Sequence, residues 1–270
     1  MYVNCHEDRK TPCLLGVYGS LCALRYTHFV EKQQFIHPLS SAIREIVSIF
    51  EQMGFSVAAG PERETEHYNF DALNVAKDHP SRDMQDTFWL GSGHVMRTHT
   101  SPVQVRYMES HKPPIRVIVP GKVYRNEATD MTHEAQFYQL EGLVIDTDVS
   151  IAHLKGTLQT FFKAFFGGSD VEVRFRPSYF PFVEPGLEVD MRLVGENVPP
   201  KLKDRWVEVM GAGMVHPRVL SGAGIDPKRY RGFAFGSGIE RLCMLKWGID
   251  DVRLFHTGDI RLVSQFPIQK

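Results

Sequence analysis

Several features are scarce in this 270-residue sequence, and each scarcity excludes a class of protein. It has four cysteines, none of them in the CxxC spacing of a zinc ribbon or a redox motif. No apolar run approaches the roughly 18–20 residues of a membrane-spanning helix, and the N-terminus lacks the basic segment of a signal peptide. Lysine and arginine number 31 against 32 aspartates and glutamates, so the net charge of −1 gives no bulk attraction for nucleic acid. We therefore expect reduced thiols, no membrane partner and a cytoplasmic location.

What is present suits a globular protein. Hydrophobic residues make up 43% and aromatic residues 11% of the chain, which is enough for a substantial core. The length fits one large domain or two small ones. Residues 1–35 hold three of the four cysteines and show no sustained hydrophobic period. We predict an N-terminal appendage of uncertain structure over 1–35 and a folded core over 36–267.

Hydrophobic periodicity predicts an α+β fold for this core. After Pro38, apolar residues at Ile43, Ile46, Val47 and Phe50 share one face of a helix. Further strands are expected over 135–146, 171–180, 187–194 and 205–215, with a helix over 151–167 and a glycine-rich strand leading into a helix over 232–249. Hairpin-type strands outnumber helices and no βαβ alternation is visible. The pattern therefore favours an antiparallel sheet flanked by helices.

Two segments have weaker patterns. The stretch IRVIVPGKVYRNE is interpreted as two strands separated by a bend at Pro120–Gly121. The stretch from Asn69 to Trp89 carries turn formers and charges and is interpreted as an irregular surface segment.

The segment GKVYRNEATDMTHEAQFYQLEG has the strongest chemical pattern. It places Arg125 and Glu127 at the end of a strand, His133 in a loop, and Phe137, Gln139 and Glu141 on one face of the next strand. An arginine in such a hairpin can bind a phosphate through two parallel hydrogen bonds. An aromatic ring gives an adenine a surface to stack on. The alternative interpretation is an exposed hairpin with surface salt bridges.

A second segment, GFAFGSGIERL, places Arg241 in the first turn of a helix behind a glycine-rich strand. Gly236 and Gly238 would let a ligand approach the backbone closely. A second arginine could bind the far end of a triphosphate. The alternative is an ordinary helix after a turn.

Together these segments resemble the signatures of class II aminoacyl-tRNA synthetases, and more closely those of the alpha subunits of bacterial-type phenylalanyl-tRNA synthetases. GFSVAAGPE is similar to the first signature, GKVYRNE…THEAQFYQLEG to the second and GFAFGSGIERL to the third. Stretches typical of the family lie between them: NFDALN, HPSRDMQDTFW, RTHTSPVQVRYM, RFRPSYFPFVEPG and GAGMVHP. The resemblance covers residues 37 to about 266, so 36–267 is expected to be the catalytic core.

The resemblance implies an ATP site. Arg125 would bind the α-phosphate and Arg241 the γ-phosphate, which makes them the expected catalytic residues. Glu127 would lie on the adenine side, Phe137 under the base, and His133 against a phosphate.

The resemblance also implies a phenylalanine site. His99 and Ser101 would lie near the carboxylate and ammonium groups, and Gln139 and Glu141 would recognise the ammonium. The pocket for the ring would comprise Phe180, Phe182, Val183, Ala234 and Gly236. Glu184 is similar to a magnesium-ligand position at the contact with a second subunit. Taken singly, each has a simpler interpretation: Phe180 and Phe182 as core, His99 as a satisfied hydrogen-bonding residue, His133 as a solvated turn residue and Glu184 as a strand end.

The expected activity is that of a phenylalanine–tRNA ligase using ATP and Mg²⁺, with phenylalanine and tRNA(Phe) as substrates. The resemblance implies a beta subunit in an alpha2-beta2 assembly, with the alpha–alpha contact formed around Gly54–Pro61. The alternative is a synthetase-like paralogue that binds an amino acid or adenylate without charging tRNA.

Three departures from the family limit what can be transferred. Residues 1–35 are too short and lack the heptads of the family's N-terminal helical arm, so we expect that arm to be absent. From the resemblance we also expect the protein to lack the C-terminal anticodon-binding domain of single-chain organellar relatives. The stretch 191–205 is longer than the usual hairpin, and Gln85 stands where some relatives have an aromatic residue or histidine.

Overall fold

The structure is a computed structural model that describes residues 34–82, 86–167, 170–195, 198, 203 and 205–268. Nearly all of the predicted appendage over 1–35, Gln85 and about half of the predicted insertion at 191–205 therefore lie outside the described residues.

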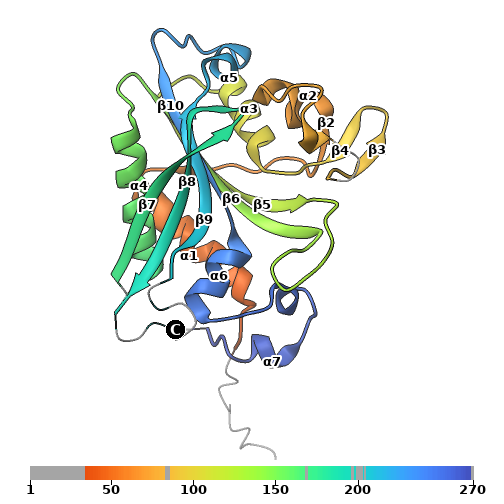
Figure 1. Cartoon of the computed structure of the whole chain (residues 1–270), viewed down its shortest axis with the longest axis vertical. Helices are drawn as coiled ribbons and strands as arrows, with labels where there is room; N and C mark the ends of the chain where they lie inside the picture. The colour runs from red at the N-terminus through yellow and green to blue at the C-terminus, as the bar shows by residue number, and fades with distance from the viewer. Residues whose placement is uncertain are drawn as a thin grey trace, which may run out of the picture. The chain divides into compact units, whose positions relative to one another are not determined.

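A seven-stranded sheet forms the centre of the fold, with the strand order β1-β5-β6-β10-β9-β8-β7 (Figure 1). All neighbouring strands in this described sheet run antiparallel except β1 and β5, which are parallel. The predicted antiparallel α+β fold is thus confirmed. The strands are β1 (Ser56–Val57), β5 (Ile115–Tyr124), β6 (Gln136–Asp146), β7 (Asp170–Phe180), β8 (Val183–Val194), β9 (Val207–Val215) and β10 (Arg231–Gly238).

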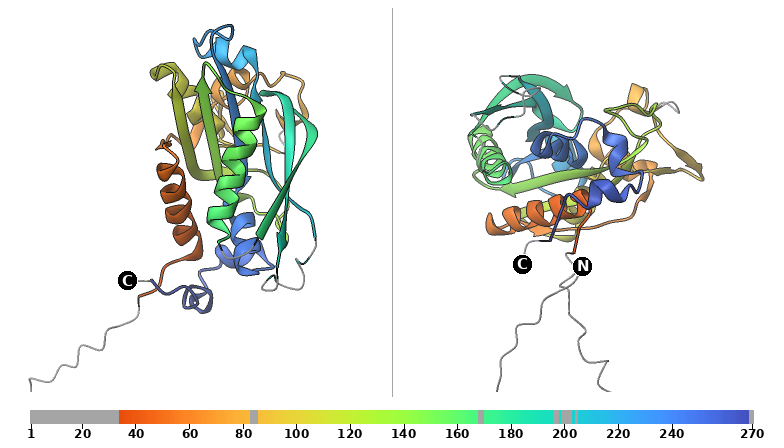
Figure 2. Two further views of the ribbon diagram at one scale, coloured as in Figure 1. Left: turned by 90° about the vertical axis from the view of Figure 1, so that its left-hand side faces the viewer. Right: turned by 90° about the horizontal axis from the view of Figure 1, so that it is seen from below.

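Three helices contribute to the larger hydrophobic core: α1 (Pro38–Gln52), α4 (Ile151–Phe165) and α6 (Ile239–Trp247). Figure 2 shows α1 and α4 side by side. The ring of Phe50 on α1 stacks on Phe161 of α4 at 4.9 Å and on Phe235 of β10 at 5.6 Å between centroids. Burial of such large rings is a main source of folding free energy. No helix in the described parts of the chain is long and apolar enough to cross a membrane.

The fold has a second layer, whose residues contribute to a second hydrophobic cluster. It contains the small sheet of β2 (Arg63–Thr65), β4 (His94–Met96) and β3 (Trp89–Gly91), and the helix α3 (Ser101–Ser110). The shorter elements are α2 (Glu66–Asn69), η1 (Asp71–Leu73), η2 (Pro80–Arg82), α5 (Pro217–Gly222), η3 (Val252–Phe255) and α7 (Ile260–Val263).

One local prediction was wrong and another was right only in part. The strand β5 runs unbroken through Pro120 and Gly121, which pair with β6. Proline is tolerated there because β1 pairs with β5 only at Val117 and Ile118. Position 120 lies beyond these two pairs, so the missing N–H of Pro120 costs no hydrogen bond to β1. The segment Asn69–Trp89 is a surface segment only in part: Asn69, Leu73, Val75 and Arg82 are buried, whereas residues 76–78 are exposed.

The buried face of α1 is also rotated from the predicted one. Leu39, Ala42, Ile46 and Phe50 are buried, whereas Ile43 and Val47 are only half-buried. The face is centred on the contacts that α1 makes with both α4 and α6, which the helical period alone does not reveal.

Gly142 offers a test of this packing. A Cβ atom on Gly142 would lie 2.1 Å from Cζ of Phe235, in the ring that stacks on Phe50. We expect Gly142→Ala to lower the free energy of unfolding by about 1–3 kcal/mol. The control is Gly156→Ala on the exposed side of α4, where no atom lies within 4 Å and alanine should stabilise the helix by about 0.5–1 kcal/mol. Urea unfolding followed by circular dichroism measures both, and equal stability of the two variants would contradict the packing described.

Candidate functional site

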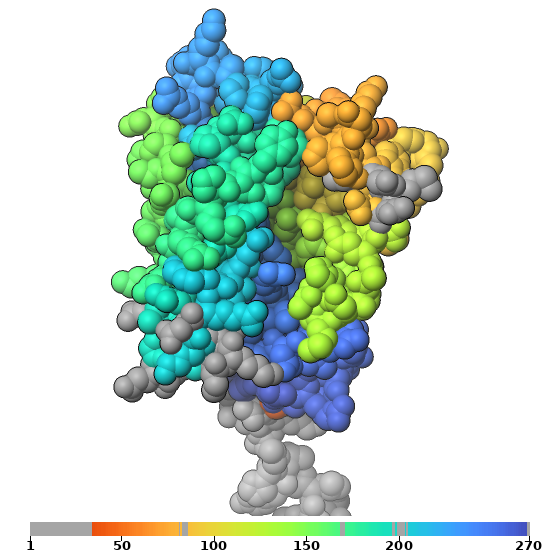
Figure 3. Space-filling view, viewed as in Figure 1, coloured from red at the N-terminus to blue at the C-terminus, as the bar shows by residue number. Residues whose placement is uncertain are grey.

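A cavity of about 1390 Å³ lies between the sheet and the second layer. Figure 3 shows the surface hollowed between the hairpin of β5 and β6 and the strands β7 to β9. Every residue predicted to bind ATP or the amino acid lines this cavity: His99, Ser101, Arg125, Glu127, His133, Phe137, Gln139, Glu141, Phe180, Phe182, Val183, Ala234, Gly236 and Arg241.

The alternation of β6 explains why three of these side chains share the cavity. Phe137, Gln139 and Glu141 lie two residues apart on one face, whereas the intervening Tyr138 and Leu140 pack into the larger core. On the neighbouring β10, Gly236 pairs with Glu141, and a Cβ at Gly236 would lie 3.0 Å from Cγ of Glu141. The glycine therefore makes space for the glutamate side chain at the floor of the cavity.

Arg125 follows β5 directly and is held at the cavity wall. Its Nε donates to the carbonyl oxygen of Thr98 at 3.2 Å, and its guanidinium lies 5.1 Å from the centroid of Phe137. Burial lowers the pKa of Arg125, against the opposing effect of Glu127 and Glu141. A half-buried cation of this kind, only partly hydrated, binds an anion more strongly than an exposed one.

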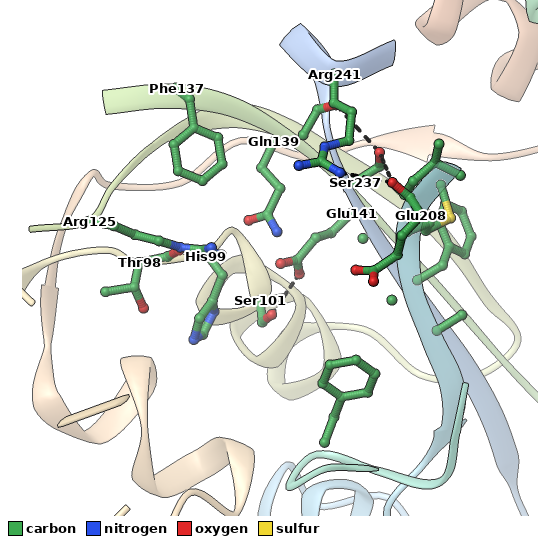
Figure 4. Close-up of a pocket in the computed structure, with 18 of the residues that line it drawn as sticks. Thr98, His99, Ser101, Arg125, Phe137, Gln139, Glu141, Glu208, Ser237 and Arg241 are labelled. Carbon is green, nitrogen blue, oxygen red and sulfur yellow. Dashed lines mark hydrogen bonds between the residues drawn. The ribbon is translucent and has the colours of Figure 1, made fainter. Parts of the chain in front are cut away.

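Arg241 enters from a different element, in the first turn of α6. Its Nη1 donates to the carbonyl oxygen of Glu208 on β9 at 3.0 Å, and its side chain is exposed. In Figure 4, Arg125, Gln139 and Arg241 point into the same space. Two guanidinium groups on separate elements can bind different parts of one polyanion.

Glu141 is the most perturbed carboxyl group of the cavity. Ser101 Oγ and Gln104 Nε2 donate to its Oε2 at 2.6 and 3.0 Å. Burial raises the pKa of Glu141 to about 7, although the hydrogen bond from Ser101 and the charges of Arg125 and Arg97 act in the opposite direction. A ligand ammonium group placed here would restore the ionised carboxylate and gain a charge-assisted hydrogen bond.

His99 lies beside this carboxyl group as a neutral polar group. Burial and the nearby charge of Arg125 lower the pKa of His99 to about 3. Its buried Nδ1 has no hydrogen-bond partner among the described residues. An unpaired buried polar atom in a cavity is a candidate ligand contact.

Aromatic rings and small residues form the far wall. The rings of Phe180 and Phe182 lie 6.0 Å apart with an angle of 19° between their planes, and both are half-buried rather than in the core. A Cβ at Gly211 would lie 3.1 Å from the Phe180 ring. Ala234 lines the cavity from β10. This wall suits a flat apolar side chain.

Two predicted residues differ from the rest. His133 lines the cavity but is exposed in the loop between β5 and β6, and its Nδ1 lies 3.0 Å from Oδ2 of Asp130. Glu184 is exposed and lines a separate cavity of about 380 Å³. No group of three or more metal-ligating side chains occurs within the described ranges, so the structure does not gather a metal site around Glu184.

Sequence reasoning missed two residues that support the site. Gln104 lies three residues after Ser101 on α3, and this spacing could have indicated a second donor for Glu141. Glu208, whose carbonyl oxygen accepts from Arg241, comes from β9 and carried no signal in the sequence.

Comparisons with known proteins find similar sequences and a similar fold. The family model for the class II core domain (F) of tRNA synthetases matches residues 26–266. The chain is 54% identical over 230 residues to a phenylalanine–tRNA ligase alpha subunit of Prochlorococcus marinus (strain MIT 9313), covering 85% of this chain and 65% of that protein. It is 55% identical over 233 residues to the alpha subunit of Alkaliphilus metalliredigens (strain QYMF), covering 85% and 68%. The chain therefore spans about two thirds of the length of these relatives.

Solved structures show the same fold at lower identity. The crystal structure of pyrrolysyl-tRNA synthetase from Desulfitobacterium hafniense has a TM-score of 0.62 to this chain at 18% sequence identity. The similarity covers 86% of this chain and 77% of that one.

Proposed function

The chain belongs to the class II core family of tRNA synthetases, and from this membership we propose that it acts as the alpha subunit of a phenylalanine–tRNA ligase. It would join phenylalanine to AMP with release of pyrophosphate and then transfer the phenylalanyl group to the 3′ end of tRNA(Phe). The observation that supports this most is the gathering of two arginines, a buried carboxyl group and an aromatic wall in one cavity.

The chemistry needs no protein nucleophile. A carboxylate oxygen of phenylalanine attacks the α-phosphorus of ATP in line, a new P–O bond forms, and the bond to pyrophosphate breaks. Arg125 would neutralise charge at the α-phosphate and Arg241 at the γ-phosphate, while Phe137 would stack on the adenine and Glu127 would lie beside it. Positioning and charge neutralisation then supply the catalysis.

The amino acid would be oriented by polar groups on one side and rings on the other. Glu141, Gln139 and Ser101 would bind its ammonium group, and His99 would lie near its carboxylate. Its ring would enter the pocket of Phe180, Phe182, Val183, Ala234 and Gly236.

Mg²⁺ would accompany ATP, neutralising phosphate charge. Because magnesium usually keeps several waters and takes only one or two carboxylates together with substrate phosphates, it does not require a closed protein site. Glu184 alone does not form one, and as a magnesium ligand it would need further oxygen ligands from water or a partner chain.

We further propose a cytoplasmic alpha2-beta2 assembly. The relatives are named alpha subunits, which implies a beta partner. The residues around Gly54–Pro61, expected at the alpha–alpha contact, include the short strand β1, where Val57 is 43% exposed.

The test is charging of tRNA(Phe) with labelled phenylalanine by the chain together with a bacterial beta subunit. We expect phenylalanyl-tRNA to form, and Arg241→Ala to reduce charging by about 10²–10³-fold because one transition-state charge contact is removed. Pyrophosphate exchange without any charging would instead favour the non-charging paralogue.

A further inference from the structure

Glu240 is a buried carboxylate that the steps above do not use, although it precedes Arg241 in α6. The residue is only 2% exposed. Both of its carboxylate oxygens accept the backbone N–H of Tyr138, at 2.8 and 3.0 Å. Tyr138 lies between Phe137 and Gln139 on β6, so Glu240 joins the helix of one arginine to the strand that carries three other site residues.

The hydrogen bond from Tyr138 to Glu240 lies just beyond the last backbone pair between β10 and β6. The strand β10 pairs with β6 as far as Gly238, which lies opposite Gln139, and the chain then turns into α6. The N–H of Tyr138 lies one residue beyond this last pair. A buried N–H without an acceptor is costly. The side chain of Glu240 therefore supplies the acceptor that a longer β10 would have supplied.

A second element contacts the same carboxylate. Nε2 of His256, which follows η3, lies 3.6 Å from Oε1 of Glu240, and this buried nitrogen has no hydrogen-bond partner among the described residues. With Tyr138 on one side and His256 on the other, the carboxylate is held by protein groups although Glu240 also lines the cavity.

The two neighbours of Tyr138 depend on this contact to different degrees. Gln139 is also held by the pairing with Gly238 and by the N–H of Thr100, which donates to its Oε1 at 3.2 Å. Phe137 lies beyond the β10 ladder and is paired on the β5 side, with Val123. Loss of the Glu240 contact should therefore disturb the ring of Phe137 more than the amide of Gln139.

We infer that Glu240 is a positioning residue for the nucleotide: it holds the Tyr138 backbone so that the Phe137 ring lies where the adenine stacks. This inference rests on the proposed function, because it assumes that ATP occupies the cavity beside Phe137. Glu240 acts through Phe137 and does not touch the reacting atoms.

The experiment compares Glu240→Gln with wild type in phenylalanine-dependent pyrophosphate exchange, using the chain with a bacterial beta subunit. Glutamine keeps the shape but offers one acceptor oxygen, and its NH₂ group cannot accept the Tyr138 N–H. We expect the KM for ATP to rise about tenfold or more, since a charge-assisted hydrogen bond is weakened. The KM for phenylalanine should change less than about twofold.

The matched control is Glu64→Gln. Glu64 is also a buried carboxylate, 1% exposed, and accepts two hydrogen bonds from Arg106, but it does not line the cavity. We expect it to lower the melting temperature without changing the ratio of the two KM values. Equal rises of both KM values in Glu240→Gln, or the same pattern in Glu64→Gln, would overturn the inference and leave Glu240 a purely structural residue.

Hydrogen exchange of the wild-type protein tests the contact without any variant. The Tyr138 amide should exchange its hydrogen at least as slowly as its neighbours in β6, and exchange as fast as in an exposed loop would refute the hydrogen bond.

A separate measurement distinguishes failure of the inference from failure of the proposed function. If wild type shows no pyrophosphate exchange, the proposed function fails. The affinity of each protein for a non-hydrolysable ATP analogue, measured by calorimetry, then tests Glu240 separately: weaker binding only in Glu240→Gln supports the inference, and equal affinities refute it.

Discussion

Arg125→Ala is expected to lower kcat/KM for pyrophosphate exchange by about 10³-fold, one of the two largest effects of any single substitution considered. The guanidinium is desolvated, and its Nε is already bound to the carbonyl of Thr98, which leaves the terminal nitrogens for a phosphate. Removal of one preorganised charge contact from an active site typically lowers the rate by about 10²–10³-fold. Arg125→Lys should recover little, because an ammonium lacks the planar fork that binds two oxygens and stacks on a ring.

The control for Arg125 is Arg116→Ala. Arg116 lies on the same strand, β5, but is exposed and does not line the cavity. Surface substitutions of this kind usually change stability by less than about 0.5 kcal/mol. Exchange by Arg125→Ala within tenfold of wild type, with Arg116→Ala unchanged, would contradict the role given to Arg125.

Glu141→Gln is expected to have two opposite effects, a loss of phenylalanine binding and a gain in stability. The KM for phenylalanine should rise by about 10²-fold, because the ammonium group loses its buried counter-charge. At the same time the unliganded protein should become more stable near pH 8, because the variant no longer has to hold an ionised carboxylate out of water.

Glu141→Gln should stabilise the protein at high pH because the pKa of Glu141 is raised in the folded state. The pKa of Glu141 is raised from 4.5 to about 7 by burial, so between these pH values the folded protein binds more protons than the unfolded chain. The cost of burying the carboxylate is therefore absent below about pH 4.5, grows as pH rises, and is fully present above pH 7. Glutamine should remove about 1–3 kcal/mol of this cost at pH 8 and almost none at pH 4.5.

Two measurements check these effects. Urea unfolding at both pH values gives the stability difference. The pH profile of kcat/KM for phenylalanine reports groups of the free enzyme, and it should fall on acidification below about pH 7 in wild type and lose this inflection in Glu141→Gln. A variant that is less stable than wild type at pH 8, or a profile with an unchanged inflection, would show that Glu141 is not the strained ammonium-binding group.

Much of the site could be predicted because its residues are close in the sequence. Phe137, Gln139 and Glu141 follow the two-residue alternation of one strand, and Arg125 ends the strand paired with it. His99 and Ser101 are likewise only two residues apart, and both line the cavity. The resemblance to a family supplied the roles that spacing alone left open.

What could not be predicted depends on contacts between distant segments. Glu240 and Tyr138 are 102 residues apart, and nothing in either local pattern indicates that one binds the other. The segment Asn69–Trp89 was misjudged for a similar reason: its charged Arg82 is buried because it binds Glu66 and Asp71 in the folded chain. Pro120 was expected to bend the strand, but a proline is tolerated there because it pairs with β6 on one side while β1, on the other side, does not reach its position.

The central claim is that the cavity activates phenylalanine with ATP. Pyrophosphate exchange into ATP tests this claim most directly, with phenylalanine compared with tyrosine and leucine, on the chain alone and with a bacterial beta subunit. The account predicts exchange that depends on phenylalanine and falls by about 10²–10³-fold in Arg241→Ala. No exchange with any of the three amino acids in either setting, from protein shown to be folded, would contradict it.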